Sequence, residues 1–500
     1  MSAERDALPG ASVGRRMIVG SAWMVAWRWS IRSLGLVSTV VLARLLTPED
    51  FGLIAMAMLV VGLIEALGDT GQHLAILRHP APTREHLDTA WTIAILIAIV
   101  TSLAMWAAAP LAAAYFGEPR ATLLIRVIAL RQLVGGFENV GVVLFRRQND
   151  FARDFRYLVY QKVGTFLVTL ALALLLRNYW ALAIGIVSGR IFSVAISFRM
   201  HPYRPRLSLS RFGELSSFSL WILVSCIGDF AIGRIDQAAV GGLAGTSAMG
   251  SYNVALDVAT APTMELIYPT ERALFPVLAS LLHDPARLKA AYLDVLSAVA
   301  VASCATGVGV ALVARDMVAV VLGPQWQAAV PLVIWLALSA AVWGICHGIV
   351  TVLNVTGRAR LTAGLSWIGL AIFGGCVALL GRRWGAEGIA AARLVYMLLL
   401  VPILFRALQC AFPVGPGEIL ARTWRAVAAA AIMALVVRAL HGGPAMPAAL
   451  RLVADIAAGA LAFPAALIAL WSVSGRPPGV EASVADLLAR LARRRGWRSA

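Results

Sequence analysis

Charged residues are scarce in this chain of 500 residues: they make up 14% of it, against about 25% in soluble globular domains. Apolar residues make up 60%, and the mean hydropathy is +0.81. So little charge excludes an ordinary soluble domain, a disordered chain and a nucleic-acid-binding domain. The composition therefore predicts an all-α, polytopic membrane protein that is in contact with membrane lipid.

Cysteines are also few, and no metal-binding spacing occurs among them. The five cysteines lie in or beside apolar runs, without a CxxC or CxxxH pattern, at Cys226, Cys304, Cys346, Cys376 and Cys410. We therefore predict no metal site, no cofactor and no disulfide framework. The amino-terminal stretch has no A-x-A-like cleavage site, so it predicts an uncleaved first helix and not a signal peptide.

Long loops are missing as well. Fourteen apolar runs, each long enough to cross about 30 Å of hydrocarbon, lie at 17–43, 51–76, 89–113, 121–145, 157–177, 179–199, 214–242, 248–273, 292–314, 328–353, 361–381, 386–408, 420–440 and 448–471. No loop reaches the ~50 residues of a minimal catalytic domain. The predicted helices themselves must therefore carry the function.

Basic residues alternate between the two faces of this predicted topology. One face holds 27 of the 43 lysines and arginines, the other face holds 7, and nine lie within the spans. Cytoplasmic loops carry the excess of positive charge, so we place both termini in the cytoplasm. The basic, amphipathic tail over 472–500 is interpreted as a solvated cytoplasmic end and not as a lipid-recognition site.

An internal repeat relates two parts of the chain. A shift of 198 residues aligns Ser21 with Ser219, Trp23 with Trp221, Gly35 with Gly233, Leu45 with Leu243, Gly52 with Gly250 and Ala57 with Ala255. Six predicted helices separate the copies, so both cross the membrane in one direction, as in transporters with two lobes. We predict an arm over 1–16, a first six-helix lobe over 17–199, a linker over 200–213, a second six-helix lobe over 214–408, an appended helix pair over 418–471 and the tail.

Ionisable residues inside predicted spans are costly, so they indicate function or pairing. Converging guanidinium groups suit a diphosphate, whose oxygens accept paired hydrogen bonds, and Arg28 and Arg32 share one helix face. We predict six diphosphate-binding residues: Arg28, Arg32, Arg131, Arg190, Lys162 and Arg234. The alternative is that first-lobe arginines, Arg126 included, pair with Glu65, Asp69 and Glu138 to hold the lobe together.

The second lobe is acidic where the first is basic. Buried carboxylates can exchange H⁺ or Na⁺ during transport. We predict four of them as cation-coupling residues, which face Arg234 and Arg393: Asp229, Asp236, Asp257 and Glu265. The alternative for Asp236 is a stabilising cluster with Arg234. Arg451 and Asp455, one helical turn apart, are predicted to neutralise each other.

Four stretches resemble, in order and spacing, the polysaccharide transporter branch of the multidrug/oligosaccharidyl-lipid/polysaccharide flippase superfamily. They are VLARLLTPEDFGLIAMA (41–57), RIDQAAVGGLAGTSAMGSYNVA (234–255), ERALFPVLASLLHDPARL (271–288) and VLGPQW (321–326). Asp236, Gly241 and Gly245 match the family pattern, and Gly242 departs from it. The resemblance implies twelve to fourteen helices in two lobes, a bacterial inner membrane and export of polyprenyl-diphosphate-linked oligosaccharide by alternating access.

The resemblance favours a flippase, not an enzyme, that moves lipid-linked repeat units to the periplasmic leaflet for exopolysaccharide, capsule or O-antigen assembly. It implies a polysaccharide polymerase and export machinery as partners. One alternative is a cation-coupled multidrug exporter of the same superfamily, against which the basic first lobe argues. From a different class, a membrane glycosyltransferase or ligase would need catalytic acids on a sizeable periplasmic loop, and the predicted loops are too short.

Overall fold

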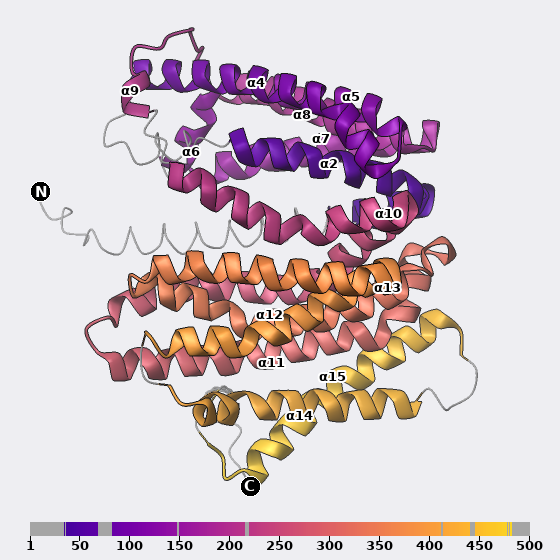
Figure 1. Ribbon diagram of the computed structural model, residues 1–500, viewed down its shortest axis with the longest axis vertical. Helices are drawn as coiled ribbons and strands as arrows, with labels where there is room; N and C mark the ends of the chain where they lie inside the picture. The colour runs from indigo at the N-terminus through magenta and orange to yellow at the C-terminus, as the bar shows by residue number, and fades with distance from the viewer. Residues whose placement is uncertain are drawn as a thin grey trace, which may run out of the picture. The chain divides into compact units, whose positions relative to one another are not determined.

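The computed structural model describes residues 35, 37–68, 83–147, 150–215, 220–411, 414–440, 446–477, 479 and 481–482. The regular elements in these ranges are helices, and nine of the described helices are long and apolar enough to cross a membrane. The predicted class, an all-helical polytopic membrane protein, is confirmed. The chain forms two compact units, unit 1 over 1–230 and unit 2 over 231–500 (Figure 1).

Unit 1 is a bundle of long helices joined by short connections. A helical stretch over 37–45 precedes α2 (Pro48–Gly68), α4 (Arg84–Phe116), α5 (Arg120–Gly135), the 3-10 helix η1 (Val140–Val142), α6 (Val143–Arg147), α7 (Phe151–Leu176), α8 (Tyr179–Met200) and α9 (Phe212–Leu215). The prediction of one helix over 121–145 is wrong. The helix α5 ends at Gly135, and a separate 3-10 helix, η1, follows. The Asn139 side chain caps η1 by accepting a hydrogen bond from the backbone of Gly141.

The core of unit 1 lies where α2, α4, α5 and α8 meet. Leu53, Met105, Leu124, Ile128 and Ala183 are fully buried there. Many of their neighbours are alanines, and small side chains let helix backbones approach closely inside a membrane. This core holds α5 and α8, which carry two of the predicted diphosphate-binding arginines, side by side.

The chain after α8 lies along the first turns of α4 as an extended strap, residues 201–211. The buried Asp88 carboxylate accepts hydrogen bonds from the Tyr203 hydroxyl and, at 2.8 Å, from the backbone of Arg206. Burial and Asp88 raise the pKa of Tyr203. Farther along, the Thr92 hydroxyl accepts a hydrogen bond of 2.9 Å from the backbone of Ser208. These bonds fix most of the predicted linker to unit 1.

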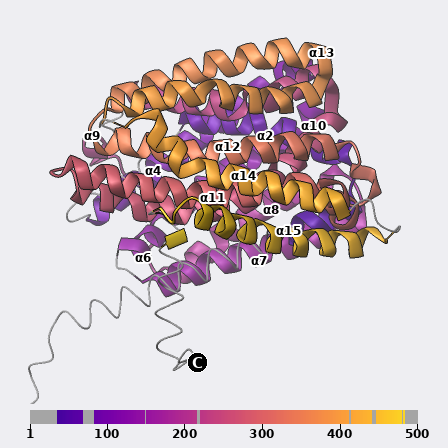
Figure 2. The same cartoon turned by 90° about the horizontal axis from the view of Figure 1, so that it is seen from below.

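Unit 2 contains the remaining helices. They are most of α10 (Leu220–Ser280), α11 (Pro285–Met317), the π-helical turn η2 (Val318–Leu322), the 3-10 helix η3 (Pro324–Trp326), α12 (Ala329–Val355), α13 (Ala359–Leu408), α14 (Pro416–Leu440) and α15 (Ala448–Val473). Within this unit α11 packs against α12 and α14, α12 packs against α13, and α14 packs against α15 (Figure 2).

Two helices of unit 2 fold back on themselves. In α10 the chain reverses at Gly245, whose φ of 82° and ψ of −176° suit glycine. The Tyr252 hydroxyl then reaches Asp236 across the turn at 2.6 Å. In α13 the turn lies at Trp384–Gly385. Gly245 follows Thr47, the residue just before α2, by the 198 residues of the predicted repeat.

The α14–α15 pair is joined to α11 at both ends. Between the ends, Ala300 and Cys304 of α11 pack on an alanine-rich stretch of α14. Arg451, on α15, donates two hydrogen bonds of 2.7 Å to Asp316 on α11, a partner that the sequence spacing did not suggest. At the other end, Arg422 on α14 pairs with Asp294 on α11 at 2.9 Å. Nearby, Arg425 on α14 and Glu481 form an ion pair of 2.9 Å, and their side chains are 3% and 4% exposed.

Candidate functional site

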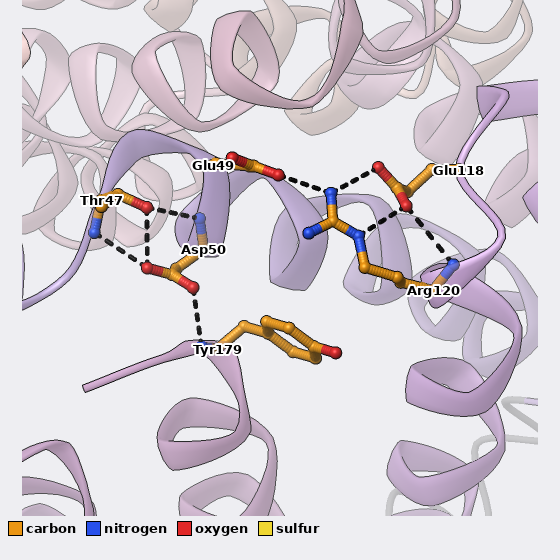
Figure 3. A network of polar contacts seen from close by, with 6 residues as sticks. All are labelled: Thr47, Glu49, Asp50, Glu118, Arg120 and Tyr179. Atoms are coloured by element: carbon orange, nitrogen blue, oxygen red, sulfur yellow. Dashed lines mark hydrogen bonds and ion pairs between the residues drawn. The ribbon is translucent and has the colours of Figure 1, made fainter. Parts of the chain in front are cut away.

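At one end of unit 1, a polar network joins the first residues of several helices (Figure 3). The Arg120 guanidinium, at the start of α5, donates to the carboxylates of Glu118 and of Glu49, at the start of α2. Hydrogen bonds to these two carboxylates raise the pKa of Arg120. Asp50, also on α2, accepts a hydrogen bond of 2.8 Å from the backbone of Tyr179, the first residue of α8. Thus α2, α5 and α8 begin at the same level.

Two of the predicted arginines lie at one depth below that level. Arg131 and Arg190 each lie eleven residues past the first residue of their helix, which corresponds to about 16 Å along the helix axis. The Arg190 guanidinium lies against Gly135, one turn after Arg131, and donates to its carbonyl oxygen at 3.4 Å. A Cβ at Gly135 would lie 2.7 Å from Arg190 Nε, so glycine leaves the room for this approach.

Each of these arginines faces a glutamate. Arg131 pairs with Glu65 of α2 at 2.6 Å, and Arg190 pairs with Glu138, just after α5, at 2.8 Å. The Tyr157 hydroxyl, on α7, donates a further hydrogen bond to Glu138. The four charged side chains are between 23% and 34% exposed. The contacts match the predicted pairing with Glu65 and Glu138, and all four side chains remain partly exposed.

The other basic side chains of the predicted first lobe lie apart from these pairs. The Arg126 guanidinium stacks over the ring of Trp106, 4.6 Å from its centroid, and Arg126 Nε is buried without a described hydrogen-bond partner. A cation over an aromatic face is stabilised there without a carboxylate. Lys162 is exposed on α7. Arg28 and Arg32 lie outside the described residues.

In unit 2 the charges centre on Asp236, whose side chain is completely buried. One carboxylate oxygen accepts hydrogen bonds from the Tyr252 hydroxyl, at 2.6 Å, and from the Arg393 guanidinium of α13. The other accepts a hydrogen bond of 2.8 Å from the backbone of Gln237. Asp236 thus takes Arg393 as its partner, and the predicted alternative, Arg234, bonds elsewhere. Both oxygens of this carboxylate are engaged.

A second row of polar side chains closes the α10 turn beside Asp236. Arg234, which is exposed, donates a hydrogen bond of 2.7 Å to the Gln237 side chain. Gln237 donates in turn to the Asn253 side chain across the turn at 3.1 Å. The turn of α10 is therefore held by two parallel contacts, Asp236 to Tyr252 and Gln237 to Asn253.

The remaining predicted coupling residues lie on α10. Asp257 is exposed and Glu265 is half-buried. Asp229 lies on the first half of α10, and its side chain is outside what the structure describes. Within the described ranges, no group of three or more histidine, cysteine, aspartate or glutamate side chains is placed to hold a metal ion.

Two tyrosines and one pairing were missed by sequence reasoning. Tyr157 and Tyr252 each hold a carboxylate, and Arg393 is the partner of Asp236. Asp236 and Arg393 are 157 residues apart in the chain, so no helical spacing indicates their contact. A signal was present only in the balance of charge, because an acid deep in a span requires a cation nearby.

The comparisons with known proteins agree on one family. Residues 41–331 match the family described as polysaccharide biosynthesis protein. The succinoglycan biosynthesis transport protein ExoT of Rhizobium meliloti is 27% identical over 459 residues, 88% of this chain and 90% of that protein. The lipopolysaccharide biosynthesis protein WzxC of Escherichia coli is 23% identical over 401 residues, covering 78% and 80%.

Among solved structures, the lipid II flippase MurJ in an inward closed conformation shares the fold. Its TM-score is 0.74 at 13% sequence identity, and the match covers 92% of this chain and all of that one. The resemblance drawn from the four sequence stretches is confirmed. Because the family match extends over more than half of its residues, the chain belongs to the polysaccharide biosynthesis protein family.

Proposed function

We propose that this protein is a flippase for polyprenyl-diphosphate-linked oligosaccharide repeat units in the bacterial inner membrane. It would move them from the cytoplasmic to the periplasmic leaflet for exopolysaccharide, capsule or O-antigen assembly. The observation that carries the proposal is the family match over residues 41–331, supported by a relative named as a succinoglycan transport protein. The flippase makes and breaks no covalent bond. A polymerase and export machinery would then take up the cargo.

The proposed architecture has fourteen spans, in two six-helix lobes and an appended pair, with both termini in the cytoplasm. The turns inside α10 and α13 support this count, because each of these helices supplies two antiparallel segments. The lobes would open in turn to the two leaflets around the cargo, as in transporters built from parallel repeats.

The diphosphate of the cargo is proposed to bind the basic side chains Arg28, Arg32, Arg131, Arg190, Lys162 and Arg234. Each guanidinium presents paired donors in a plane, which matches two phosphate oxygens better than a lysine ammonium does. The common depth of Arg131 and Arg190 supports the proposal, because about 16 Å lies near the middle of a 30 Å hydrocarbon layer.

A gradient of H⁺ or Na⁺ is proposed to drive the cycle through Asp229, Asp236, Asp257 and Glu265. The buried Asp236 carboxylate is held by Tyr252 and Arg393. A cation that binds there has to displace the Arg393 guanidinium. Coupling at Asp236 would therefore move Arg393, whereas Asp257 and Glu265 lie farther along α10 and are at least partly accessible.

Deletion of the gene tests the proposed function. Lipid-linked repeat units should accumulate at the cytoplasmic leaflet, the polysaccharide should be lost, and wild-type protein should restore it. A drug exporter would leave the polysaccharide unchanged and alter drug tolerance. Normal polysaccharide in the deletion strain, with no second flippase acting, contradicts the proposal.

A further inference from the structure

The two arginine–glutamate pairs of unit 1 share features that a purely structural ion pair does not need. Each joins different elements: Arg131 of α5 to Glu65 of α2, and Arg190 of α8 to Glu138 after α5. All four side chains keep 23% to 34% of their surface exposed. A partly exposed ion pair costs less to open than one with a fully buried partner, such as Arg393 with Asp236.

The two arginines approach one face of α5 about one helical turn apart. Arg190 donates to the carbonyl oxygen of Gly135, which lies one turn beyond Arg131 on the same face of α5. One helical turn is about 5.4 Å. Two adjacent phosphoryl groups therefore suit the two arginines better than a single phosphoryl group does.

We infer that Glu65 and Glu138 are resident counter-anions, which occupy Arg131 and Arg190 until a diphosphate displaces both carboxylates. The inference rests on the proposed function, and it assigns these glutamates a role in substrate selection. A diphosphate diester carries two negative charges, so it replaces two carboxylates without changing the net charge that the arginines experience.

The counter-anions select against common lipids. A phosphodiester headgroup carries one negative charge and can satisfy one arginine, which leaves the second carboxylate in place or strands an arginine. Proteins commonly gain specificity by making the complex with the wrong ligand unfavourable. The two glutamates thereby keep membrane phospholipids, which surround the protein in excess, out of the arginine site.

Tyr157 acts as a positioning residue for Glu138. Its hydroxyl donates to the carboxylate and lies 3.0 Å from the hydroxyl oxygen of Ser193 on α8. When the carboxylate leaves Arg190, the hydrogen bond from Tyr157 keeps it partnered. This limits the cost of opening the pair, because a largely covered carboxylate without any partner would be destabilising.

Binding of short polyprenyl phosphates to the full-length protein in phosphatidylcholine nanodiscs tests the inference. The wild type should prefer farnesyl diphosphate to farnesyl methyl monophosphate, a phosphodiester that carries one negative charge. In the Glu65→Gln, Glu138→Gln double variant, the monophosphate should bind up to about fivefold tighter, the upper value of one partly exposed ion pair. The preference for the diphosphate should fall accordingly.

A matched control is Glu118→Gln, which removes a carboxylate from Arg120 at the end of the same unit. This variant should keep the wild-type preference. If the double variant does not fold, difference infrared spectra of the wild type, recorded with and without lipid, test the inference instead. Farnesyl diphosphate should then perturb carboxylate bands, and the monophosphate should not.

The outcomes separate the inference from the proposed function. A wild type that binds farnesyl diphosphate, with an unchanged preference in the folded double variant or no carboxylate band, overturns the inference and leaves the flippase proposal standing. A wild type that binds neither lipid and flips none overturns both.

Discussion

Both units contain an arginine, a carboxylate and a tyrosine in contact, but the two triads differ in burial. In unit 1, Arg190, Glu138 and Tyr157 meet with charged side chains that are 31% and 23% exposed. In unit 2, Arg393 is 23% exposed, whereas its partner Asp236 is completely buried and also bonds Tyr252. The same three groups thus occur once in an accessible form and once in a closed form.

The difference shows which ion pair can exchange partners. The Asp236 carboxylate accepts hydrogen bonds at both oxygens and has no contact with solvent. Removal of one partner of a buried pair strands the other charge, which is costly. Glu138 keeps part of its surface open, so an incoming anion can reach Arg190. We therefore assign the unit 2 triad, as long as Arg393 stays paired with Asp236, to stability, so that coupling at Asp236 would require this pair to open. We assign the unit 1 triad to binding.

The largest expected effect comes from breaking the closed triad. Asp236→Asn should lower the free energy of unfolding by about 3–5 kcal/mol, because it strands the Arg393 guanidinium. Glu138→Gln should cost about 1 kcal/mol or less, the usual value for an accessible pair. Thermal and denaturant unfolding of both purified variants in detergent measures the difference.

Removal of the stranded charge is the control for that experiment. The double variant Asp236→Asn, Arg393→Met should recover part of the lost stability, whereas Asp236→Asn with Arg234→Met should not, because Arg234 bonds Gln237. Equal unfolding free energies for Asp236→Asn and the wild type would contradict the assignment of this triad to stability.

The next largest loss of stability is expected at two turns that the repeat relates by 198 residues, at Gly245 in unit 2 and at Thr47 in unit 1. Gly245→Ala should cost about 1–3 kcal/mol, because an alanine is strained at a φ of 82° and a ψ of −176°. No heavy atom lies within 4 Å of the added Cβ, so the cost is one of backbone conformation alone.

In unit 1 the matching turn is stabilised by side chains. Thr47 and Asp50 bond each other's backbone at the start of α2, and Thr47→Ala should cost about 1 kcal/mol. Unfolding curves of Gly245→Ala and Thr47→Ala sharpen the comparison between the units. A larger loss in Thr47→Ala would show that the two turns are not stabilised in these different ways.

A functional effect is expected at the accessible triad. Arg190→Lys should reduce export about tenfold at unchanged protein abundance, because an ammonium cannot supply paired donors in a plane. Arg131→Lys should behave alike, and Arg120→Lys, at the end of the unit, is the matched control. Export is measured as polysaccharide per cell at equal protein level. Full export in the Arg131→Lys, Arg190→Lys double variant would reduce these arginines to structural residues.

The smallest effect is a pH dependence of the strap in unit 1. Burial, Arg153 and Arg204 lower the pKa of His201 below its ordinary value of 6.5. His201 Nδ1 accepts a hydrogen bond of 3.1 Å from the backbone of Tyr203, which a proton on this nitrogen would break. His201 binds a proton more readily when the strap is released than when it is folded, because its pKa is lowered only in the folded strap. The folded strap should therefore become less stable as the pH decreases below 6.5.

Amide hydrogen exchange over residues 201–211 measures this effect. Protection should decrease at pH 5.5 relative to pH 7.5 in the wild type, after correction for the intrinsic exchange rates. In His201→Asn, which keeps an acceptor but does not titrate, the difference should be smaller. An equal difference in both proteins would show that another group causes it.

The helices could largely be predicted from the sequence, because local signals mark their ends. Asn178 caps α8 by accepting a hydrogen bond from the backbone of Trp180, and Thr47 and Asp50 mark the start of α2. The break after α5 could not be predicted. Gly135 and Gly136 stand in an apolar run, and glycine is tolerated inside helices at a cost of about 1 kcal/mol.

The partners of the buried charges could not be predicted, because they come from distant parts of the chain. Charge counting placed Glu65 and Glu138 among the candidate partners of the first-lobe arginines, and the structure joins them to Arg131 and Arg190. The nearest candidate for Asp236 was Arg234, but packing supplies Arg393. Spacing along a helix reports only contacts within that helix.

The most direct test of the account is flipping in proteoliposomes that contain the purified full-length protein. A fluorescent polyprenyl lipid carries one sugar repeat through either a diphosphate or a monophosphate link, and dithionite destroys dye in the outer leaflet. If the protein is a flippase selective for diphosphates, vesicles with the wild type should expose the diphosphate-linked lipid to dithionite much faster than protein-free vesicles do. They should expose the monophosphate-linked lipid only a little faster. Equal rates for the diphosphate lipid with and without protein would contradict the account.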